Sequence, residues 1–269
     1  MKQEQFNFKK KYGQNFLKDD SIPRKIVEAA NIPDDTLVIE IGPGAGALTK
    51  FLATRAKQVL AYEIDDSLEE ILDTNLIGLD NVCVIYDDFL KRDILKDLSN
   101  YSYSHLYVVA NLPYYITTPI ITGLVESGLD IEKIVVMIQK EVADRYAARV
   151  GTREYGSITV FLNYYYDIKK EFLVSRNCFV PKPNVDSIII SLNRKKDLLP
   201  LNNEKLFLTF TFSFSDNNTI LLLIILIYLF RLNSTIIFFV INMVRIKGIN
   251  KINKFIKNLL ICLYGLLNL

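Results

Sequence analysis

The sequence is poor in the residue types that build metal centres and thiol chemistry. Its 269 residues include one histidine, His105, and three cysteines, Cys83, Cys178 and Cys262, with no Cys-x-x-Cys spacing among them. Zinc clusters and Cys/His nucleophile pairs need several such side chains at short spacings. The composition therefore predicts no metal site, and it predicts reduced thiols in a cytoplasmic protein.

The beginning of the chain has no apolar run long enough for a signal peptide. The first residues, MKQEQFNFKKKYGQNF, carry charges and amides instead, so export is not indicated. Two apolar runs near the other end, residues 220–230 and 236–244, are each shorter than the roughly 18 residues of a membrane helix. We expect no membrane partner, and a membrane hairpin is the alternative.

The formal net charge of +2 is unevenly distributed. From Asp216 onward the chain has six Lys or Arg and one acidic residue, so the preceding part is near neutral and slightly acidic. Bulk charge is therefore a weak argument for nucleic acid, and the one local cluster that suits phosphates is Lys9–Lys11. A solvated charge run is the alternative for that cluster.

Short apolar runs alternate with segments of helical length. Five runs are expected as strands: 37–41, 59–63, 82–86, 106–110 and 134–138. This alternation predicts an α/β fold in which a parallel sheet has helices on both faces. Residues 157–168 fit a helix or a strand, and residues 185–192 are expected as a late edge strand.

A glycine-rich loop, in EIGPGAGALT, follows the first of these strands. Gly42, Gly44 and Gly46 permit a tight turn and a close approach of a ligand to the backbone at the start of a helix. Glu63 ends the next strand 21 positions after Gly42, where a carboxylate can accept hydrogen bonds from both hydroxyls of a ribose. Nicotinamide and sulfonium cofactors are both open at this point.

An acidic pair follows the third strand in YDDFL. Asp88 is placed to hold an adenine amino group while the ring of Phe89 packs on the base. An ordinary turn at Asp87 and Asp88 is the alternative.

The fourth strand ends in Asn111, Leu112, Pro113 and Tyr114. A tight hairpin would need glycine after the asparagine, and a helix start gains nothing from the tyrosine. Taken with the glycine loop and the two acids, N-L-P-Y resembles the motif set of amino-methyltransferases. Those enzymes use S-adenosylmethionine, and their acceptor is an exocyclic amine of a base.

The amine of adenine is a poor nucleophile because its lone pair is delocalised into the ring. The side-chain oxygen of Asn111 and the carbonyl oxygen of Leu112 are each placed to accept one N6 hydrogen, which draws the nitrogen towards tetrahedral geometry. Pro113 stiffens the backbone, and Tyr114 stacks on the base. No general base is needed, because the sulfonium makes the methyl group electrophilic and the product can lose its proton to solvent.

Six sequence blocks in order resemble the bacterial small-subunit (16S) ribosomal RNA adenine N6,N6-dimethyltransferases. They are KKYGQNFL, EIGPGAGALT, NLPYYITTPI, MIQKEVADRYAA, EYGSITV and FVPKPNVDSIII, and they run from about Lys10 to about Arg194. That family has relatives among the macrolide-resistance methylases and the mitochondrial transcription factors. The resemblance implies a Rossmann-like methyltransferase sheet, and it adds Asn15, Leu17 and Asn111 as cofactor contacts.

By the same resemblance, Phe179 is the second aromatic that sandwiches the flipped adenine opposite Tyr114. The implied reaction makes N6,N6-dimethyladenosine on two adjacent adenosines near the 3′ end of small-subunit rRNA during ribosome assembly. The implied enzyme is a monomer that acts on the immature subunit. The alternatives are a large-subunit methylase of the macrolide-resistance type and a non-catalytic nucleic-acid-binding relative, while EYGSITVF and TTPI favour the small-subunit branch.

Two parts of the chain are expected: a catalytic domain over residues 1–195 and a C-terminal segment over residues 196–269. The resemblance implies a small basic helical domain in the second part. The similarity stops at Ser215, however, in FSFSDNNTI. The residues that follow are rich in Ile, Leu, Phe, Asn, Lys and Tyr, as expected for AT-rich DNA read in a shifted frame.

We therefore predict that the residues from about 216 onward are a frameshifted tail. The phosphate contacts that position rRNA would then be missing, so RNA affinity would be weaker while the catalytic domain could still fold. Sequencing the DNA of the locus tests this prediction. If no change of reading frame restores a basic helical domain, the hypothesis is wrong.

Overall fold

The computed structural model describes residues 15–150 and 152–198. The strands in this part of the chain are β1 (Phe16–Leu17), β2 (Thr36–Ile41), β3 (Gln58–Glu63), β4 (Val82–Tyr86), β5 (His105–Asn111), β6 (Lys133–Gln139), β7 (Tyr166–Val174), β8 (Phe179–Val180) and β9 (Ser187–Arg194). The α-helices are α1 (Ser21–Ala30), α2 (Thr49–Ala53), α3 (Glu69–Asn75), α4 (Ile94–Leu98), α5 (Thr117–Glu126), α6 (Lys140–Tyr146) and α7 (Ser157–Tyr165). Short 3-10 helices are η2 (Asp66–Leu68), η3 (Phe89–Lys91), η4 (Tyr114–Ile116) and η5 (Arg176–Cys178). Among the described residues, no helix is long and apolar enough to cross a membrane.

The described residues divide into two compact units, one made of 15–147 and 162–198 and the other containing 148–150 and 152–161. The boundary expected at residue 195 stays a prediction, because most of the C-terminal segment lies outside the described residues. The strands of the central sheet all belong to the first unit.

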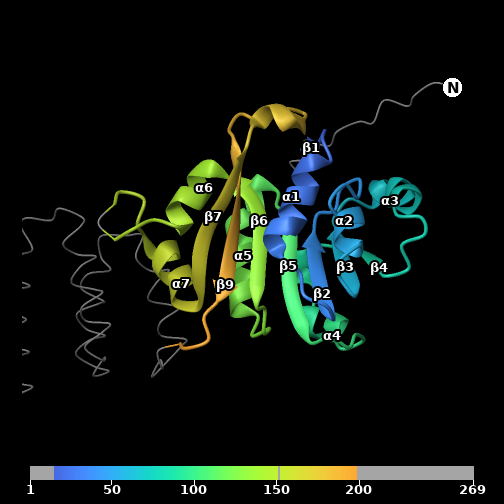
Figure 1. Ribbon diagram of the computed structural model, residues 1–269, viewed down its shortest axis with the longest axis horizontal. Helices are drawn as coiled ribbons and strands as arrows, with labels where there is room; N and C mark the ends of the chain where they lie inside the picture. The colour runs from blue at the N-terminus through green and yellow to red at the C-terminus, as the bar shows by residue number, and fades with distance from the viewer. Residues whose placement is uncertain (1–14, 151, 199–269) are drawn as a thin grey trace, which may run out of the picture. The chain divides into compact units, whose positions relative to one another are not determined.

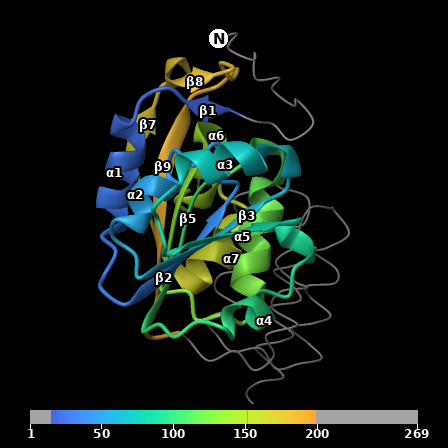
Figure 2. The ribbon, with the colours of Figure 1, turned by 90° about the vertical axis from the view of Figure 1, so that its right-hand side faces the viewer.

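A seven-stranded mixed sheet forms the centre of this unit, with strand order β4-β3-β2-β5-β6-β9-β7 (Figure 1). Neighbouring strands from β4 to β6 are parallel, whereas β9 pairs antiparallel with both β6 and β7. All five strands expected from apolar runs are present, and the α/β class is confirmed. Helices α1 and α2 lie on one side of the sheet and α4 and α5 on the other (Figure 2).

The sheet differs from the sequence-based expectation at its antiparallel end. We expected residues 185–192 to be an edge strand, which is wrong because β9 lies between β6 and β7. The segment 157–168 contains both a helix and a strand, since α7 ends at Tyr165 and β7 begins at Tyr166. The charged run Lys169–Glu171 on the outer strand interrupts its apolar pattern, so β7 is hard to predict from sequence alone.

The core between α1, α2 and the sheet is formed by aliphatic side chains. Ile26, Ala30 and Leu52 have no exposed surface, and they pack with Val38, Val59 and Val109 of the central strands. Strands β2, β5 and β6 are buried over most of their length, which explains why they are continuous apolar runs.

Strand register brings the ends of the parallel strands together. Ile41 of β2 pairs with Tyr62 of β3, and Ile39 pairs with Val108 of β5. The loop after β2 therefore lies beside Glu63 at the end of β3 and Asn111 at the end of β5. In doubly wound sheets ligands bind at this carboxyl edge.

Candidate active site

A pocket at the carboxyl edge collects most of the side chains predicted from the sequence. It is lined by Asn15, Phe16, Leu17, Glu40, Gly42, Pro43, Gly44, Ala45, Ala47, Leu48, Glu63, Ile64, Asn111, Leu112, Pro113 and Tyr114. These residues come from β1, the glycine loop and the ends of β2, β3 and β5. Segments far apart in sequence thus form one site.

The glycine loop needs its glycines for both conformation and space. Gly42 and Gly44 have φ values of 71° and 60°, a region that favours glycine, and the Gly42 N–H donates to the Tyr62 carbonyl at 2.9 Å. A Cβ on Gly44 would lie 3.0 Å from the Phe16 ring. The loop is therefore closely covered by the β1 segment.

Glu63 is held at the end of β3 by backbone groups. Its side chain is buried, and its two oxygens accept hydrogen bonds from the N–H groups of Gly44 at 3.0 Å and Asp65 at 2.9 Å. Burial raises the pKa of Glu63, although these two donors offset part of the rise. Each carboxylate oxygen has a second acceptor site, so both oxygens can also accept hydrogen bonds from hydroxyl groups.

Glu40 is a pocket residue that the sequence reasoning missed. It lies within β2, is 1% exposed, and its Oε2 has no hydrogen-bond partner among the described residues. Burial raises the pKa of Glu40 to about 8; the nearby Thr49 hydroxyl offsets part of this, and the neighbouring Glu63 carboxylate adds to it. An unpaired buried acceptor that lines a pocket suits a cationic or hydrogen-donating ligand.

The N-L-P-Y segment continues β5 into α5. Leu112 is buried, and its N–H donates to the Met137 carbonyl at 3.2 Å, which fixes the backbone beside the pocket. The Asn111 Nδ2 donates to the Asn15 carbonyl at 3.3 Å. A carbonyl can only accept, so the Nδ2 side of the amide faces Asn15 and the Oδ1 side is left to accept from another donor.

Pro113 and Tyr114 form the turn that follows. Pro113 has φ −60° and ψ 131°, and its carbonyl accepts a hydrogen bond from the Thr117 hydroxyl at 3.0 Å. Tyr114 is half-buried, and its hydroxyl lies 2.6 Å from the Ser187 hydroxyl. Burial raises the pKa of Tyr114, so the phenol is neutral at physiological pH.

A two-stranded ribbon covers the pocket. In it, β1 pairs antiparallel with β8, with Phe16 opposite Val180 and Leu17 opposite Phe179 (Figure 2). Through this pairing the residues expected over the cofactor, Asn15 and Leu17, reach the pocket from the start of the chain. The N-terminal segment is thereby tied to the F-V-P-K-P segment.

Two predicted site residues lie outside the pocket lining. Asp88 follows β4 at the same edge of the sheet, where its carboxylate accepts from the Leu90 N–H at 3.1 Å and pairs with Lys91. Phe179 has no exposed surface and packs in the core with Leu17 and Val174. A ring buried in this way cannot stack on a base in this conformation, so the sandwich role of Phe179 and the adenine contact of Asp88 stay predictions.

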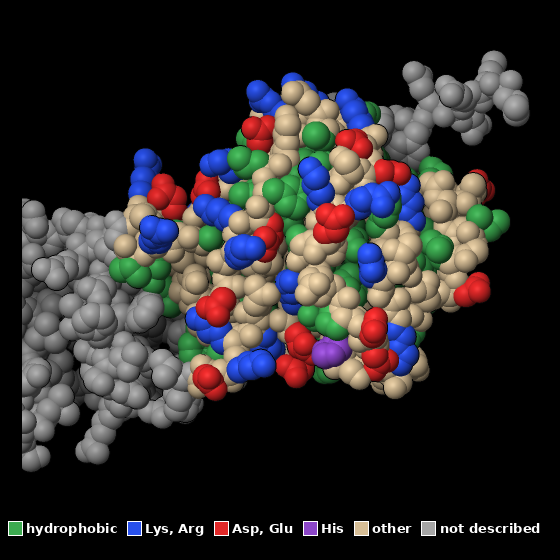
Figure 3. Space-filling model, in the orientation of Figure 1, with side chains coloured by type: hydrophobic (Ala, Val, Ile, Leu, Met, Phe, Trp, Pro, Cys, Tyr) green, Lys and Arg blue, Asp and Glu red, His purple; other side chains and the backbone are tan. Residues whose placement is uncertain are grey.

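Basic side chains lie near the ribbon that covers the pocket. Lys18 directly follows β1, Arg176 lies in η5 just before β8, and Lys182 follows β8; all three are exposed. Figure 3 shows Lys and Arg side chains at the top of the view, where Figure 1 labels β1. Cations beside a pocket suit the phosphates of a nucleic acid. The expected cluster Lys9–Lys11 lies outside the described residues.

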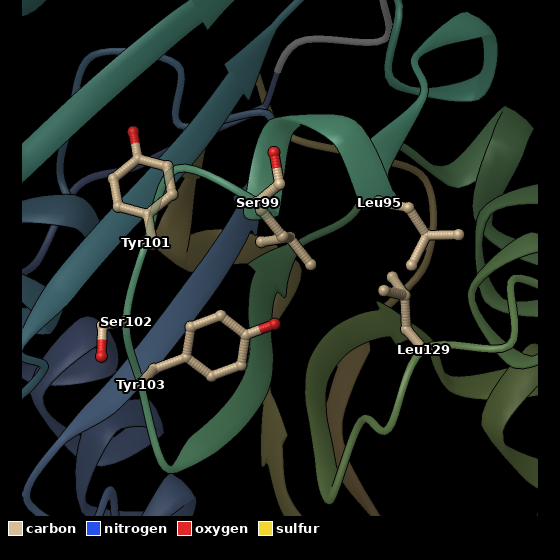
Figure 4. Close-up of a pocket in the computed structure, with 7 residues that line it drawn as sticks. Leu95, Ser99, Tyr101, Ser102, Tyr103 and Leu129 are labelled. Atoms are coloured by element: carbon tan, nitrogen blue, oxygen red, sulfur yellow. The ribbon is translucent and has the colours of Figure 1, made fainter.

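A separate hollow of about 570 Å³ lies at the opposite ends of the strands. Leu95, Tyr101, Tyr103 and Leu129 are among its lining residues, and Figure 4 shows the side chains of Leu95 and Leu129 close to each other. Its lining has no carboxylate, imidazole or ammonium group. We assign it no chemistry.

Comparisons with known proteins agree with the site. The family described as "Ribosomal RNA adenine dimethylase" matches residues 5–216, which is more than half of the chain. The chain belongs to the ribosomal RNA adenine dimethylase family. Homology thus confirms the predicted enzyme class, an rRNA adenine dimethyltransferase, and members of this family depend on S-adenosylmethionine.

Two relatives within this family are named ribosomal RNA small subunit methyltransferase A. The protein of Streptococcus pneumoniae is 52% identical over 194 residues, which cover 71% of this chain and 67% of that protein. The protein of Enterococcus faecalis is 49% identical over 215 residues, which cover 78% of this chain and 72% of that protein. These identities agree with the predicted small-subunit branch.

Two solved structures support the fold. A dimethyladenosine transferase from Plasmodium falciparum is 32% identical with a TM-score of 0.60, and the match covers 67% of this chain and 64% of that one. The 23S rRNA methyltransferase ErmE is 30% identical with a TM-score of 0.61, and that match covers 76% of this chain and 81% of the other. The Rossmann-like methyltransferase sheet is therefore confirmed for the dimethylase.

Glu40→Gln is expected to stabilise the dimethylase at alkaline pH. With its pKa raised from the usual 4.5 to about 8, Glu40 contributes stability that is fully present below pH 4.5 and is lost as the pH rises towards 8. A neutral amide avoids that loss, so the gain in unfolding free energy should grow to a few kcal/mol, an order-of-magnitude value, at about pH 8.5. Urea denaturation at about pH 5 and about pH 8.5 measures it.

The matched control is Glu141→Gln, on the exposed surface of α6. Its effect on stability should be small at both pH values, because a solvated carboxylate gains little from neutralisation. A Glu40→Gln gain of the same size at acid and alkaline pH would contradict the assignment.

Proposed function

We propose that this dimethylase transfers methyl groups from S-adenosylmethionine to N6 of two adjacent adenosines near the 3′ end of small-subunit (16S) rRNA. One observation carries the proposal: the Asn111 amide and the Leu112 backbone line the same pocket as the glycine loop and Glu63. The acceptor groups for an adenine amine and the groups for a nucleoside cofactor thus lie together.

The pocket residues fit an adenosyl cofactor. Gly42 and Gly44 let a ligand approach the backbone, and the two buried carboxyl groups, Glu40 and Glu63, offer acceptors for its hydroxyl and ammonium groups. Asn15 and Leu17 would cover it from the ribbon. When bound, S-adenosylmethionine supplies a methyl group that its sulfonium makes electrophilic.

The residues at the end of β5 act on the acceptor amine. Asn111 Oδ1 and the Leu112 carbonyl oxygen each accept one N6 hydrogen, which holds the nitrogen lone pair out of conjugation and towards the methyl donor. Tyr114 supplies a ring for the base to stack on. Among the described residues that line the pocket, the titratable side chains are Glu40, Glu63 and Tyr114, and the reaction needs none of them as a general base.

The small-subunit substrate is supported by two relatives at about half identity that carry that name. The exposed cations Lys18, Arg176 and Lys182 beside the pocket suit rRNA phosphates. We propose a monomer that acts on the immature subunit, and therefore a cytoplasmic location. The large-subunit alternative is supported by the likeness to ErmE at 30% identity.

The C-terminal tail remains a separate proposal. Residues 217–269 lie outside the range matched by the family, which supports a departure near residue 216. A chain with an aberrant tail would keep the pocket and hold rRNA weakly.

Glu63→Gln is expected to weaken binding of S-adenosylmethionine by about tenfold or more. A charged acceptor of two hydroxyl hydrogen bonds is replaced by an amide that can accept at one atom only. Isothermal calorimetry measures the affinity. The control is Glu132→Gln, because the Glu132 carboxylate pairs with His105 away from the pocket. Binding of a nicotinamide cofactor in place of S-adenosylmethionine would contradict the proposal.

Asn111→Ala is expected to lower the rate of methyl transfer to immature small subunits by about 100-fold or more, because one of the two acceptors for the amine is lost. Transfer of a labelled methyl group from S-adenosylmethionine measures the rate. Asn81→Ala, which also removes an asparagine bonded to backbone carbonyls, should leave the rate near that of the unmodified chain.

Two outcomes would redirect the assignment. Label that reaches only large-subunit RNA would support the macrolide-resistance type. Full function in assembly without any effect of Asn111→Ala would support a non-catalytic nucleic-acid-binding protein.

A further inference from the structure

The side chain of Tyr114 is fixed at both of its ends. Its backbone begins η4 directly after Pro113, and its hydroxyl lies 2.6 Å from the hydroxyl of Ser187. A tyrosine ring that is held only at Cα can swing about two side-chain torsions. A hydrogen bond at the far end opposes the swing about the first torsion and fixes the axis of the ring, because the phenolic oxygen lies on that axis.

Ser187 is well suited to act as an anchor. It is the first residue of β9, has no exposed surface, and pairs with Gln139 of β6 on one side and Val174 of β7 on the other. The residue before it, Asp186, accepts from the Lys140 N–H at 3.0 Å and, through its carboxylate, from the Arg176 N–H at 2.9 Å. The position of the Ser187 hydroxyl is thus set by several elements at once.

The described residues include a second tyrosine whose hydroxyl is hydrogen-bonded to another side-chain hydroxyl. The Tyr114–Ser187 pair differs from it because Tyr114 lines the pocket. Tyr146 and Thr118 have hydroxyls 2.8 Å apart, but Tyr146 is 1% exposed, so that bond pairs a phenol buried away from solvent. Tyr114 is half-buried and lines the pocket beside Asn111 and Leu112. Its ring is a surface that a ligand can touch, so its orientation affects function.

We propose that Ser187 is a positioning residue for methyl transfer, which holds the Tyr114 ring as one wall of the slot for the target adenine. This rests on the proposed function, because the slot is where the amine meets Asn111. With the ring fixed, a stacked base presents N6 to the two acceptors in one orientation. Without the anchor, the wall moves and the amine reaches those acceptors less often.

The chain offers a close control for Ser187. Ser191 lies four residues further along β9, on the same face of the strand, and is 1% exposed. Its hydroxyl donates to Glu171 at 2.7 Å, and it does not line the pocket. Replacing either serine by alanine removes one buried hydroxyl and one hydrogen bond from the same strand.

Ser187→Ala is expected to lower kcat for methyl transfer about tenfold, with affinity for S-adenosylmethionine within about twofold of the unmodified chain, because the anchor acts on the base and not on the cofactor. Ser191→Ala should leave kcat unchanged at a similar loss of stability. Tyr114→Phe, which removes the same bond from the other side, should match Ser187→Ala. The double variant should be no slower than either, because both remove one interaction.

A spectroscopic measurement tests the anchor without any methyl transfer. In protein with labelled tyrosine, three-bond scalar couplings across the Cα–Cβ bond should show that Tyr114 populates additional rotamers of its first torsion in Ser187→Ala, with no change in Ser191→Ala. A chain that holds this ring but methylates no adenosine would refute the proposed function and leave the anchor established. An unchanged rotamer population of Tyr114, equal kcat values for the two serine variants, or additive effects in the double variant would refute the positioning role. Should Ser187→Ala not fold, Tyr114→Phe decides, and a normal kcat in that variant refutes the role.

Discussion

Parallel pairing of β2 with β3 and β5 is the constraint on which the site depends. Ile41 lies opposite Tyr62 and Ile39 opposite Val108, so the glycine loop, Glu63 and Asn111 end at one edge of the sheet. A shift of one residue in either pairing would turn the following side chains to the other face. The buried aliphatic faces of these strands oppose such a shift. Packing of the core therefore positions Glu63 and Asn111 at the strand ends.

The pocket brings together two buried carboxyl groups and several acceptor atoms. Glu63 uses two backbone donors, whereas Glu40 has an oxygen without a partner among the described residues and a pKa raised to about 8. Such a carboxyl group costs stability that an aliphatic side chain would not. The cost is consistent with a site selected for binding a cation with hydroxyl groups, since stability and function often conflict at binding sites.

Much of this site could be predicted because its residues follow apolar strands in a fixed order. Gly42, Gly44, Glu63 and Asn111 each stand at a strand end, where a polar residue or glycine after an apolar run is conspicuous. Glu40 was missed for the opposite reason. It lies inside LVIEI, where neighbours buried on both faces give no alternation, and the one signal was a charged residue within a run that should exclude it.

Features that depend on contacts between distant segments were beyond the sequence. The pairing of β1 with β8 joins strands of two residues each, too short to show a period. The burial of Phe179 and the contact of Ser187 with Tyr114 both follow from the path of the chain after β7, which places β9 inside the sheet. A family pattern assigns a residue to a motif, but which way its side chain points is decided by packing.

Asn111 links the cover of the pocket to the chemistry at its base. Its amide nitrogen donates to the Asn15 carbonyl in the segment that leads into β1, and β1 is paired with β8. Because the amide is planar, the bond that fixes its nitrogen also directs its oxygen, which is the atom assigned to the adenine amine. The position of the covering ribbon therefore sets the orientation of the Asn111 amide. When the ribbon covers the pocket, the Asn111 oxygen is held in the orientation that the proposed reaction needs.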